Sequence, residues 1–212
     1  PYRFGVIRAE ALGASLGIMH VAAEAALRAD DRWTSTGNGW FMRANVTQSW
    51  IARRIIEVLN AVRSIAIEPL FQSLKRVATK KFIEQGCQMP TRGLLVKFVQ
   101  ELRAEGVRFD IVLEIASVDA PVHDRESSGT TQSILKTFDA QHRALTGSEV
   151  ASKFESFGMS FASAQLALSS SPLITRLERG IYGLVGRHAD TRDIANARLR
   201  REAGKLVASV DD

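Results

Sequence analysis

The sequence predicts a mainly α-helical protein of the α+β class with small β-hairpins. Apolar residues recur at helical spacing over much of the 212-residue chain, which indicates amphipathic helices. Short apolar runs beside turn-forming residues indicate strands. The order helix, short strand, helix, turn, helix, strand, turn, strand occurs twice, at 46–115 and at 131–187. This is the order of a winged helix-turn-helix, so we expect tandem units of this kind after an N-terminal helical segment.

The N-terminal helical segment spans residues 1–45. Its Ala-rich apolar pattern predicts one helix over about 14–29,. The turn sequence TSTGNG lies between Trp33 and Trp40. Turn residues between aromatic residues predict a short hairpin.

Residues 46–115 are expected to form a degenerate winged helix. Asn45 or Thr47 is expected to cap a helix whose apolar stripe runs from Trp50 to Val62,. A strand-like run at 65–67, a helix from Glu68, another from Pro90 and one or two strands over 107–115 complete the predicted unit. The polar segment 116–130 follows and is interpreted as a linker or domain boundary,.

The clearest winged helix is expected at 131–187. A helix over 132–142 precedes a second helix capped by Thr146 or Ser148, and Gly158 supplies the tight turn before a third helix that starts at Ser160,. Strands at 173–177 and 181–185 form the predicted wing. On the third helix the spacing predicts inward-facing Phe161, Ala164 and Leu168, and outward-facing Ser160, Ser163, Ala167 and Ser170.

The last segment, 188–212, is expected to form a C-terminal helix over 191–207. This helix carries apolar residues that include Ile194 and Leu199. It is therefore expected to pack back on the chain or to mediate dimerisation.

The composition narrows the function classes. The formal net charge is +5, and the predicted unit 46–115 has eleven Lys and Arg residues against seven Asp and Glu residues. Such positive blocks favour a polyanionic partner. No apolar run is long enough to cross a bilayer, and the single Cys87 is consistent with a reducing cytoplasm,. We expect no membrane association, a cytoplasmic, nucleoid-associated location, and, because Pro1 is not an initiator Met, a processed chain or a piece of a larger protein.

No catalytic or cofactor motif is present. The four His residues and one Cys have no zinc-ligand spacing,, and no phosphate-binding loop or nucleophile-elbow motif occurs. We therefore expect no enzyme activity in this chain, no metal and no cofactor.

The candidate nucleic-acid-binding residues are small polar or basic and fall on three parts of the predicted units. Hydroxyl and amide groups on the third helix of unit 131–187 can reach phosphates or base edges, and arginines on its wing can meet the DNA backbone. A basic stretch in unit 46–115 can clamp a phosphate. The candidates are Ser160, Ser163, Gln165, Ser170, Arg176, Arg179, Arg187, Lys75, Arg76, Lys80 and Lys81.

The run LSSSPLITRLERGIYGLVG at 168–186 also carries a resemblance. It resembles the end of the winged helix in bacterial sigma-factor-like proteins and in the restriction-associated HARE-HTH family, over about 55 residues. The matching positions are Ser171, Pro172, Ile174, Arg176, Arg179, Gly180, Ile181, Tyr182, Leu184 and Gly186. The resemblance implies DNA binding within a larger bacterial regulatory or restriction- and defence-linked protein.

Two functions stay open from the sequence. The first is duplex DNA binding, mostly through phosphate contacts. The second is a winged-helix module for protein docking or dimerisation, since the third helix has no Lys or Arg between Met159 and Ser171 and arginine on guanine is the commonest specific base contact. The expected partners are double-stranded DNA and a homodimer mate or a partner protein.

Overall fold

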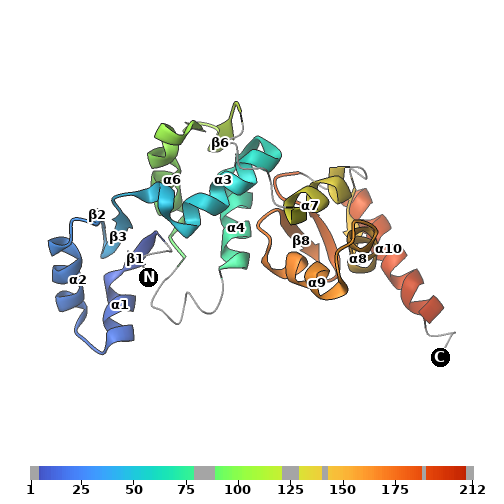
Figure 1. The fold of residues 1–212 in the computed structure, drawn as a ribbon, viewed down its shortest axis with the longest axis horizontal. Helices are drawn as coiled ribbons and strands as arrows, with labels where there is room; N and C mark the ends of the chain where they lie inside the picture. The colour runs from blue at the N-terminus through green and yellow to red at the C-terminus, as the bar shows by residue number, and fades with distance from the viewer. Residues whose placement is uncertain (1–4, 79–88, 121–128, 140–142, 188–189, 209–212) are drawn as a thin grey trace. The chain divides into compact units, whose positions relative to one another are not determined.

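The computed structural model describes residues 5–78, 89–120, 129–139, 143–187 and 190–208 (Figure 1). Helices alternate with small antiparallel sheets, which confirms the α+β class. The chain forms two compact units, Pro1–His123 and Asp124–Asp212. The first unit contains two modules and the second unit contains one. The described residues of all three share the order strand, helix, helix, strand, strand, and a further helix precedes this order in the second and third modules.

The first module begins with a strand. It consists of β1 (Val6–Arg8), α1 (Ala9–Leu16), α2 (His20–Ala29), β2 (Trp33–Gly37) and β3 (Trp40–Arg43). The sheet has the order β1-β3-β2 and is antiparallel throughout. Its core is a cluster of buried residues from the sheet and both helices: Ile7, Ala9, Leu27, Trp33 and Phe41.

The single helix expected over 14–29 is wrong, although the expected hairpin between Trp33 and Trp40 is confirmed. Gly17 adopts a left-handed φ of 68° and ends α1, so the chain turns before α2 begins,. Gly13 lets the two helices approach closely, because a Cβ there would lie 2.9 Å from the carbonyl oxygen of Ile18. The segment 1–45 is therefore more than a helical segment, since it contains two helices and a three-stranded sheet.

The second module starts with a helix. It contains α3 (Trp50–Val62), β4 (Ser64–Ala66), α4 (Ile67–Val77), α6 (Arg92–Glu101), β5 (Val107–Asp110) and β6 (Ile115–Val118). The short 3-10 helices η1 (Val46–Gln48) and η2 (Leu102–Glu105) precede α3 and follow α6. The sheet order is β4-β6-β5.

The predicted helices of this module and the strand before α4 are confirmed, but two predictions are wrong. Residues 111–114, expected in strands, form the turn between β5 and β6, and neither predicted residue caps α3. Ser49, not Asn45 or Thr47, accepts a hydrogen bond from the backbone of Ala52 at 3.1 Å. Residues 46–48 form η1 instead, which shifts the start of α3 to the next available hydroxyl,.

The third module has the same order. It contains α7 (Gly129–Asp139), β7 (Leu145–Thr146), α8 (Gly147–Ser156), α9 (Phe161–Ser170), β8 (Ile174–Glu178) and β9 (Ile181–Leu184), followed by α10 (Thr191–Ala208). The sheet order is β7-β9-β8. Ala197 of α10 is buried against Ala144 and Ile181, so the C-terminal helix packs back on its own module.

The linker expected at 116–130 is shorter than the sequence indicated. Its first residues belong to β6, where Ala116 pairs with Ile65 of β4 and with Phe109 of β5. Its last residues open α7 at Gly129. The polar composition of this segment did not indicate a strand. Strand β6 forms there because it is the central strand of its sheet and is stabilised by long-range pairing on both sides,.

The three modules share a detailed geometry. In each, the first residue of the helix that follows the first strand (α1, α4 or α8) donates its backbone N–H to a carbonyl of the hairpin: Ala9 to Gly39 at 2.8 Å, Ile67 to Glu114 at 2.9 Å and Gly147 to Gly180 at 3.0 Å. All three acceptor residues have a positive φ, of 72°, 51° and 73° in chain order. The helices α2, α6 and α9, which precede the three hairpins, have ten residues each. The modules are therefore structural repeats of one another, and each hairpin is tied to the start of its own helix pair.

Gly5 joins the first module to the second within their compact unit. Its carbonyl accepts a hydrogen bond from the backbone of Arg43 at 2.9 Å, and its φ is 109°. A Cβ at this position would lie 2.5 Å from Cβ and 2.7 Å from Oγ of Ser49, the cap of α3. The first strand therefore passes directly over the start of α3, and only glycine fits there.

Candidate nucleic-acid interface

The α8–α9 pair of the third module makes the tight turn that the sequence predicted. Gly158 has a φ of 79° and donates its backbone N–H to the carbonyl of Glu155 at 2.8 Å. Met159 donates to the carbonyl of Phe154 at 3.0 Å. Ser160 then caps α9 by accepting from the backbone of Ser163 at 3.2 Å. The prediction of Gly158 as the turn and Ser160 as the start of the helix is confirmed.

The polar candidates on α9 are mostly exposed. Ser160, Ser163 and Gln165 are exposed and Ser170 is half-buried. Several of the hydroxyls are engaged within the helix, because Ser160 Oγ donates to Ser163 Oγ at 3.0 Å and Ser170 Oγ donates to the carbonyl of Leu166 at 2.7 Å. Contacts to DNA from these groups therefore compete with hydrogen bonds already present in α9.

The predicted faces of α9 are wrong at two positions. Phe161, expected inside, has 61% of its surface exposed, and Ala167, expected outside, is buried. Ala164 and Leu168 are buried as predicted. Phe161 is the first residue of the helix, one turn before the part of α9 that packs on the module.

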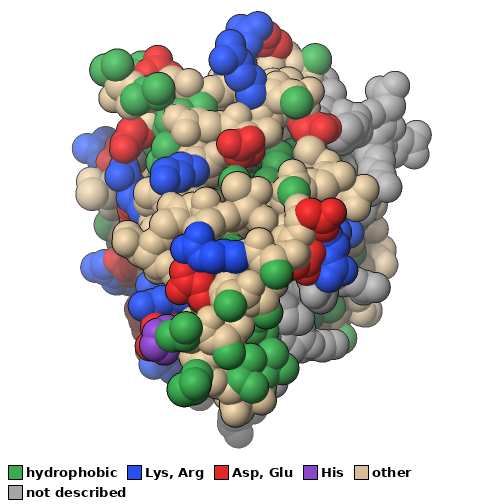
Figure 2. All heavy atoms as spheres, turned by 90° about the vertical axis from the view of Figure 1, so that its left-hand side faces the viewer, with side chains coloured by type: hydrophobic (Ala, Val, Ile, Leu, Met, Phe, Trp, Pro, Cys, Tyr) green, Lys and Arg blue, Asp and Glu red, His purple; other side chains and the backbone are tan. Residues whose placement is uncertain are grey.

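The α8–α9 pair also exposes three large apolar side chains among its exposed polar residues. Phe157 and Leu166 have 42% and 65% of their surfaces exposed, beside the exposed Phe161. The first module exposes apolar residues in the corresponding place, around the α1–α2 turn: Leu16, Ile18, Met19 and Val21. In Figure 2, which views the molecule from the left-hand side of Figure 1, hydrophobic side chains gather at the lower end. Two of the three repeats thus expose several large apolar side chains near the turn between their two helices.

The hairpin of the third module presents two of the predicted arginines to solvent. Arg176 on β8 and Arg179 at the turn are both exposed. The Arg176 Nε donates to the carbonyl of Glu178 at 3.4 Å. In the described part of the chain, no ion pair or hydrogen bond involves the Arg179 guanidinium. Arg187 is exposed just after β9.

Two arginines of α10 lie beside this hairpin, and the sequence analysis did not single them out. Arg198 makes a two-pronged ion pair with Glu178, with N···O distances of 2.5 and 3.2 Å. Arg201 donates to the carbonyl of Arg179. The hydrogen bond from Arg198 holds the pKa of Glu178 below its usual range. Arg198, and not the neighbouring Arg179, therefore pairs with the carboxylate of Glu178.

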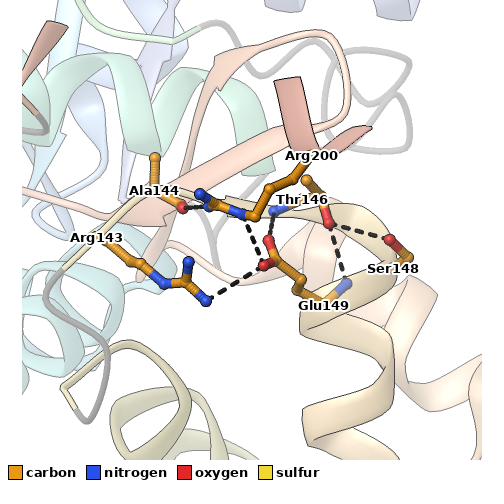
Figure 3. A network of polar contacts seen from close by, with 6 residues as sticks. All are labelled: Arg143, Ala144, Thr146, Ser148, Glu149 and Arg200. Atoms are coloured by element: carbon orange, nitrogen blue, oxygen red, sulfur yellow. Dashed lines mark hydrogen bonds and ion pairs between the residues drawn. The ribbon is translucent and has the colours of Figure 1, made fainter. Parts of the chain in front are cut away.

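Glu149 anchors α10 to the start of α8 (Figure 3). Its carboxylate accepts from the backbone of Thr146 at 2.7 Å, from Arg200 at 2.9 Å and from Arg143 at 3.3 Å. Thr146 in turn accepts from the backbone of Glu149 at 3.2 Å, which completes a capping box,. Thr146, one of the two predicted caps, is thus confirmed, and Ser148 contacts its hydroxyl at 3.0 Å.

Opposing effects act on the pKa of Glu149. Partial burial raises the pKa, but the hydrogen bonds from Thr146 and Arg200 and the charge of Arg200 outweigh burial. The pKa therefore lies below its usual value, and the carboxylate is charged at neutral pH. Arg200 of α10 also donates to the carbonyl of Ala144 at 2.8 Å. The network therefore fixes α10 to the residue before β7 as well as to α8.

The basic stretch predicted in the second module is only partly described. Lys75 is exposed near the end of α4 and Arg76 is half-buried. Lys80 and Lys81 lie outside the described residues. The stretch therefore contributes one exposed cation, Lys75, to the described surface.

Comparisons with known proteins identify no relative: no family model, no curated protein and no solved structure matches this chain. Among the described residues no helix is long and apolar enough to cross a membrane. The same residues contain no group of three or more His, Cys, Asp or Glu side chains that could hold a metal ion.

Proposed function

We propose that this chain binds duplex DNA through tandem winged helix-turn-helix units. The observation that carries the proposal is the exposed arginine pair, Arg176 and Arg179, on a hairpin that follows a tight helix-turn-helix. A strand, two helices joined by a tight turn and a hairpin are the parts of a winged helix. The hairpin is the wing, and its guanidinium groups suit phosphate oxygens.

The wing is the basic part of the third module because α10 supports it. Arg198 neutralises Glu178, the acidic residue between the two wing arginines. Arg201 holds the backbone of Arg179 at the turn. Because Arg198 offsets the negative charge of Glu178, the outer face of the wing is positive, which favours a polyanion,.

Phosphate contacts supply most of the affinity in this proposal. Helix α9 of the third module, which follows the tight turn, has no Lys or Arg, so it offers little direct base readout,. Binding should then depend steeply on salt: about four to six phosphate contacts give a slope of log K against log salt of roughly −4 to −5. A titration of the full chain with duplex DNA measures this slope. No binding at about 50 mM salt with micromolar protein would contradict the proposal.

Replacement of Arg179 tests the wing. We expect Arg179→Ala to weaken binding to all duplex sequences by about 1 kcal/mol and to lower the salt slope by about one, with the same expected for Arg176→Ala. Lys136→Ala is the matched control, since it removes an exposed charge from α7 of the same module. Equal affinities for all variants and the wild type would show that the wing does not contact DNA.

Protein docking remains the second candidate, because the first and third modules expose large apolar side chains near the turn between their two helices. Exposed apolar patches commonly mark protein interfaces. Phe161→Ser separates the two functions. If the helix-turn-helix surface docks a protein and the wing binds DNA, this variant retains the salt slope and DNA affinity of the wild type. A large loss of DNA affinity, with unchanged thermal stability, would place Phe161 at the DNA.

A further inference from the structure

The hairpin of the second module ends in three consecutive aliphatic side chains that face solvent. Ile111, Val112 and Leu113 form the turn between β5 and β6 (Figure 1), with 71%, 90% and 65% of their surfaces exposed. Hairpin turns normally carry Gly, Asn, Asp, Ser or Pro. The sequence pattern had placed these residues in strands. We call the three residues the apolar tip.

The apolar tip is held in a fixed shape. Asp110 Oδ1 accepts hydrogen bonds from the backbones of Val112 and Leu113, at 2.8 and 2.9 Å. Glu114 has a left-handed φ of 51°, and its carboxylate pairs with Arg92 of α6. Its carbonyl also accepts from Ile67 at 2.9 Å. A preformed tip loses little conformational entropy on binding.

A hollow of about 980 Å³ adjoins the tip. It lies between η2 and β5. Its lining contains the apolar residues Ala104, Val107, Phe109 and Ala120, the cations Arg103 and Arg108, and the carboxylates Glu105 and Asp119. Ile111 of the apolar tip lines the same hollow. Tip and hollow are therefore parts of one continuous surface.

The charged residues around the apolar tip indicate which class of partner can bind there. Asp110 and Glu114 flank the tip, and carboxylates repel both DNA phosphates and anionic lipid. In the described residues no ion pair involves the Asp110 carboxylate or the Arg103 guanidinium, whereas Arg108 pairs with Asp119. Among the described residues the tip thus offers a carboxylate outside any ion pair, Asp110, and the hollow offers such a guanidinium, Arg103, although Glu105 and Asp119 balance the two arginines of the lining. A second copy of this chain offers the complement to both.

We propose that the apolar tip inserts into the hollow of a second copy and forms a two-fold dimer. A two-fold interface requires that one surface patch be complementary to itself. This patch meets that requirement, since the protruding tip and the receiving hollow lie side by side on the same module. The dimer is independent of DNA and leaves the wing of the third module uninvolved.

The mass of the full chain in solution tests the proposal. Sedimentation equilibrium at about 100 µM protein, a hundredfold above a Kd of 1 µM, should give a dimer for the wild type and a monomer for Val112→Asp. Leu199→Asp is the control, because Leu199 is 70% exposed on α10 in the other compact unit; it should remain dimeric. A monomeric wild type, or a dimer of unchanged affinity in Val112→Asp, overturns the proposal.

A second pair of variants tests the charges. Asp110→Asn keeps the Oδ1 acceptor that shapes the turn but removes the negative charge, and Arg103→Gln removes the positive one. Each should weaken dimerisation about fivefold, and the double variant should weaken it little further, since paired groups do not act additively. Fully additive effects would show that the two side chains do not face each other across the interface.

Cross-linking locates the contact. In a background with Cys87→Ser, Val112→Cys is mixed with an affinity-tagged Ala104→Cys chain and treated with a short bismaleimide. The cross-linked product expected is the mixed dimer of one tagged and one untagged chain. Absence of the mixed product while the wild type is dimeric would place the interface elsewhere and overturn the proposal.

Discussion

Replacement of Gly5 by Ala is expected to lower the free energy of unfolding of the first compact unit by about 3 kcal/mol. Two effects combine. A non-glycine residue at a φ of 109° is strained, which costs about 1–3 kcal/mol. The new Cβ would also lie 2.5 Å from Ser49 Cβ, and overpacking of a buried contact costs about 1–3 kcal/mol.

The residue that the new Cβ would displace, Ser49, itself stabilises α3. Ser49 is fully buried and caps α3, so displacing it removes the hydrogen bond to Ala52. A lost cap costs about 1 kcal/mol. Gly5→Ala should therefore loosen the start of α3 and its contact with the first module together.

Urea unfolding followed by tryptophan fluorescence measures this effect selectively. All three Trp residues of the chain, Trp33, Trp40 and Trp50, lie in the first compact unit. Gly17→Ala is the matched control, because Gly17 is also left-handed, with a φ of 68°, but a Cβ there meets nothing within 4 Å. The control should cost only the backbone strain, about 1 kcal/mol. Equal losses for the two variants would show that the contact with Ser49 contributes nothing.

Glu149→Gln is expected to destabilise the second compact unit by about 2 kcal/mol at neutral pH. Hydrogen bonds to charged groups contribute about 1.5–3 kcal/mol, and the carboxylate accepts from Thr146, Arg200 and Arg143. Because the folded pKa of Glu149 is lowered, this contribution is present above the unfolded pKa. It is lost as the pH falls through the folded pKa.

The difference in stability between the wild type and Glu149→Gln should therefore shrink as the pH falls below the ordinary carboxyl value of about 4.5. Far-UV circular dichroism measures the unfolding of the helices in both units. Tryptophan fluorescence reports on the first unit alone, so the transition seen only by circular dichroism belongs to the second unit, which contains no Trp. Glu155→Gln is the control, because Glu155 is exposed on the same helix. A difference that is constant from pH 7 to about 3 would mean that the charge of Glu149 is not what stabilises the network.

The repeating order of elements was predictable from the sequence at 46–187, because local signals specify it. Apolar spacing locates α3, α4 and α6, and Thr91, Thr146 and Ser160 cap helices where hydroxyl residues precede apolar runs,. The β8–β9 hairpin was also predictable, since Arg179-Gly180 between two apolar runs is a turn signal,. The first repeat was missed because Ala-rich spacing runs through Gly17 without interruption, and only the left-handed turn and the pairing of β1 reveal it.

The surroundings of the candidate site needed the tertiary structure. A run of arginines at the end of the chain was visible in the sequence, but nothing in its spacing assigns Arg198 to Glu178 or Arg200 to Glu149, which are 20 and 51 residues away. The exposure of Phe161 likewise depends on where the first turn of α9 emerges from the module. The sequence by itself determined which segments become helices, turns and strands, since capping, turn chemistry and apolar periodicity act over a few residues. Only the tertiary structure decided which side chains meet and which face solvent, because those outcomes depend on packing between segments far apart in the chain.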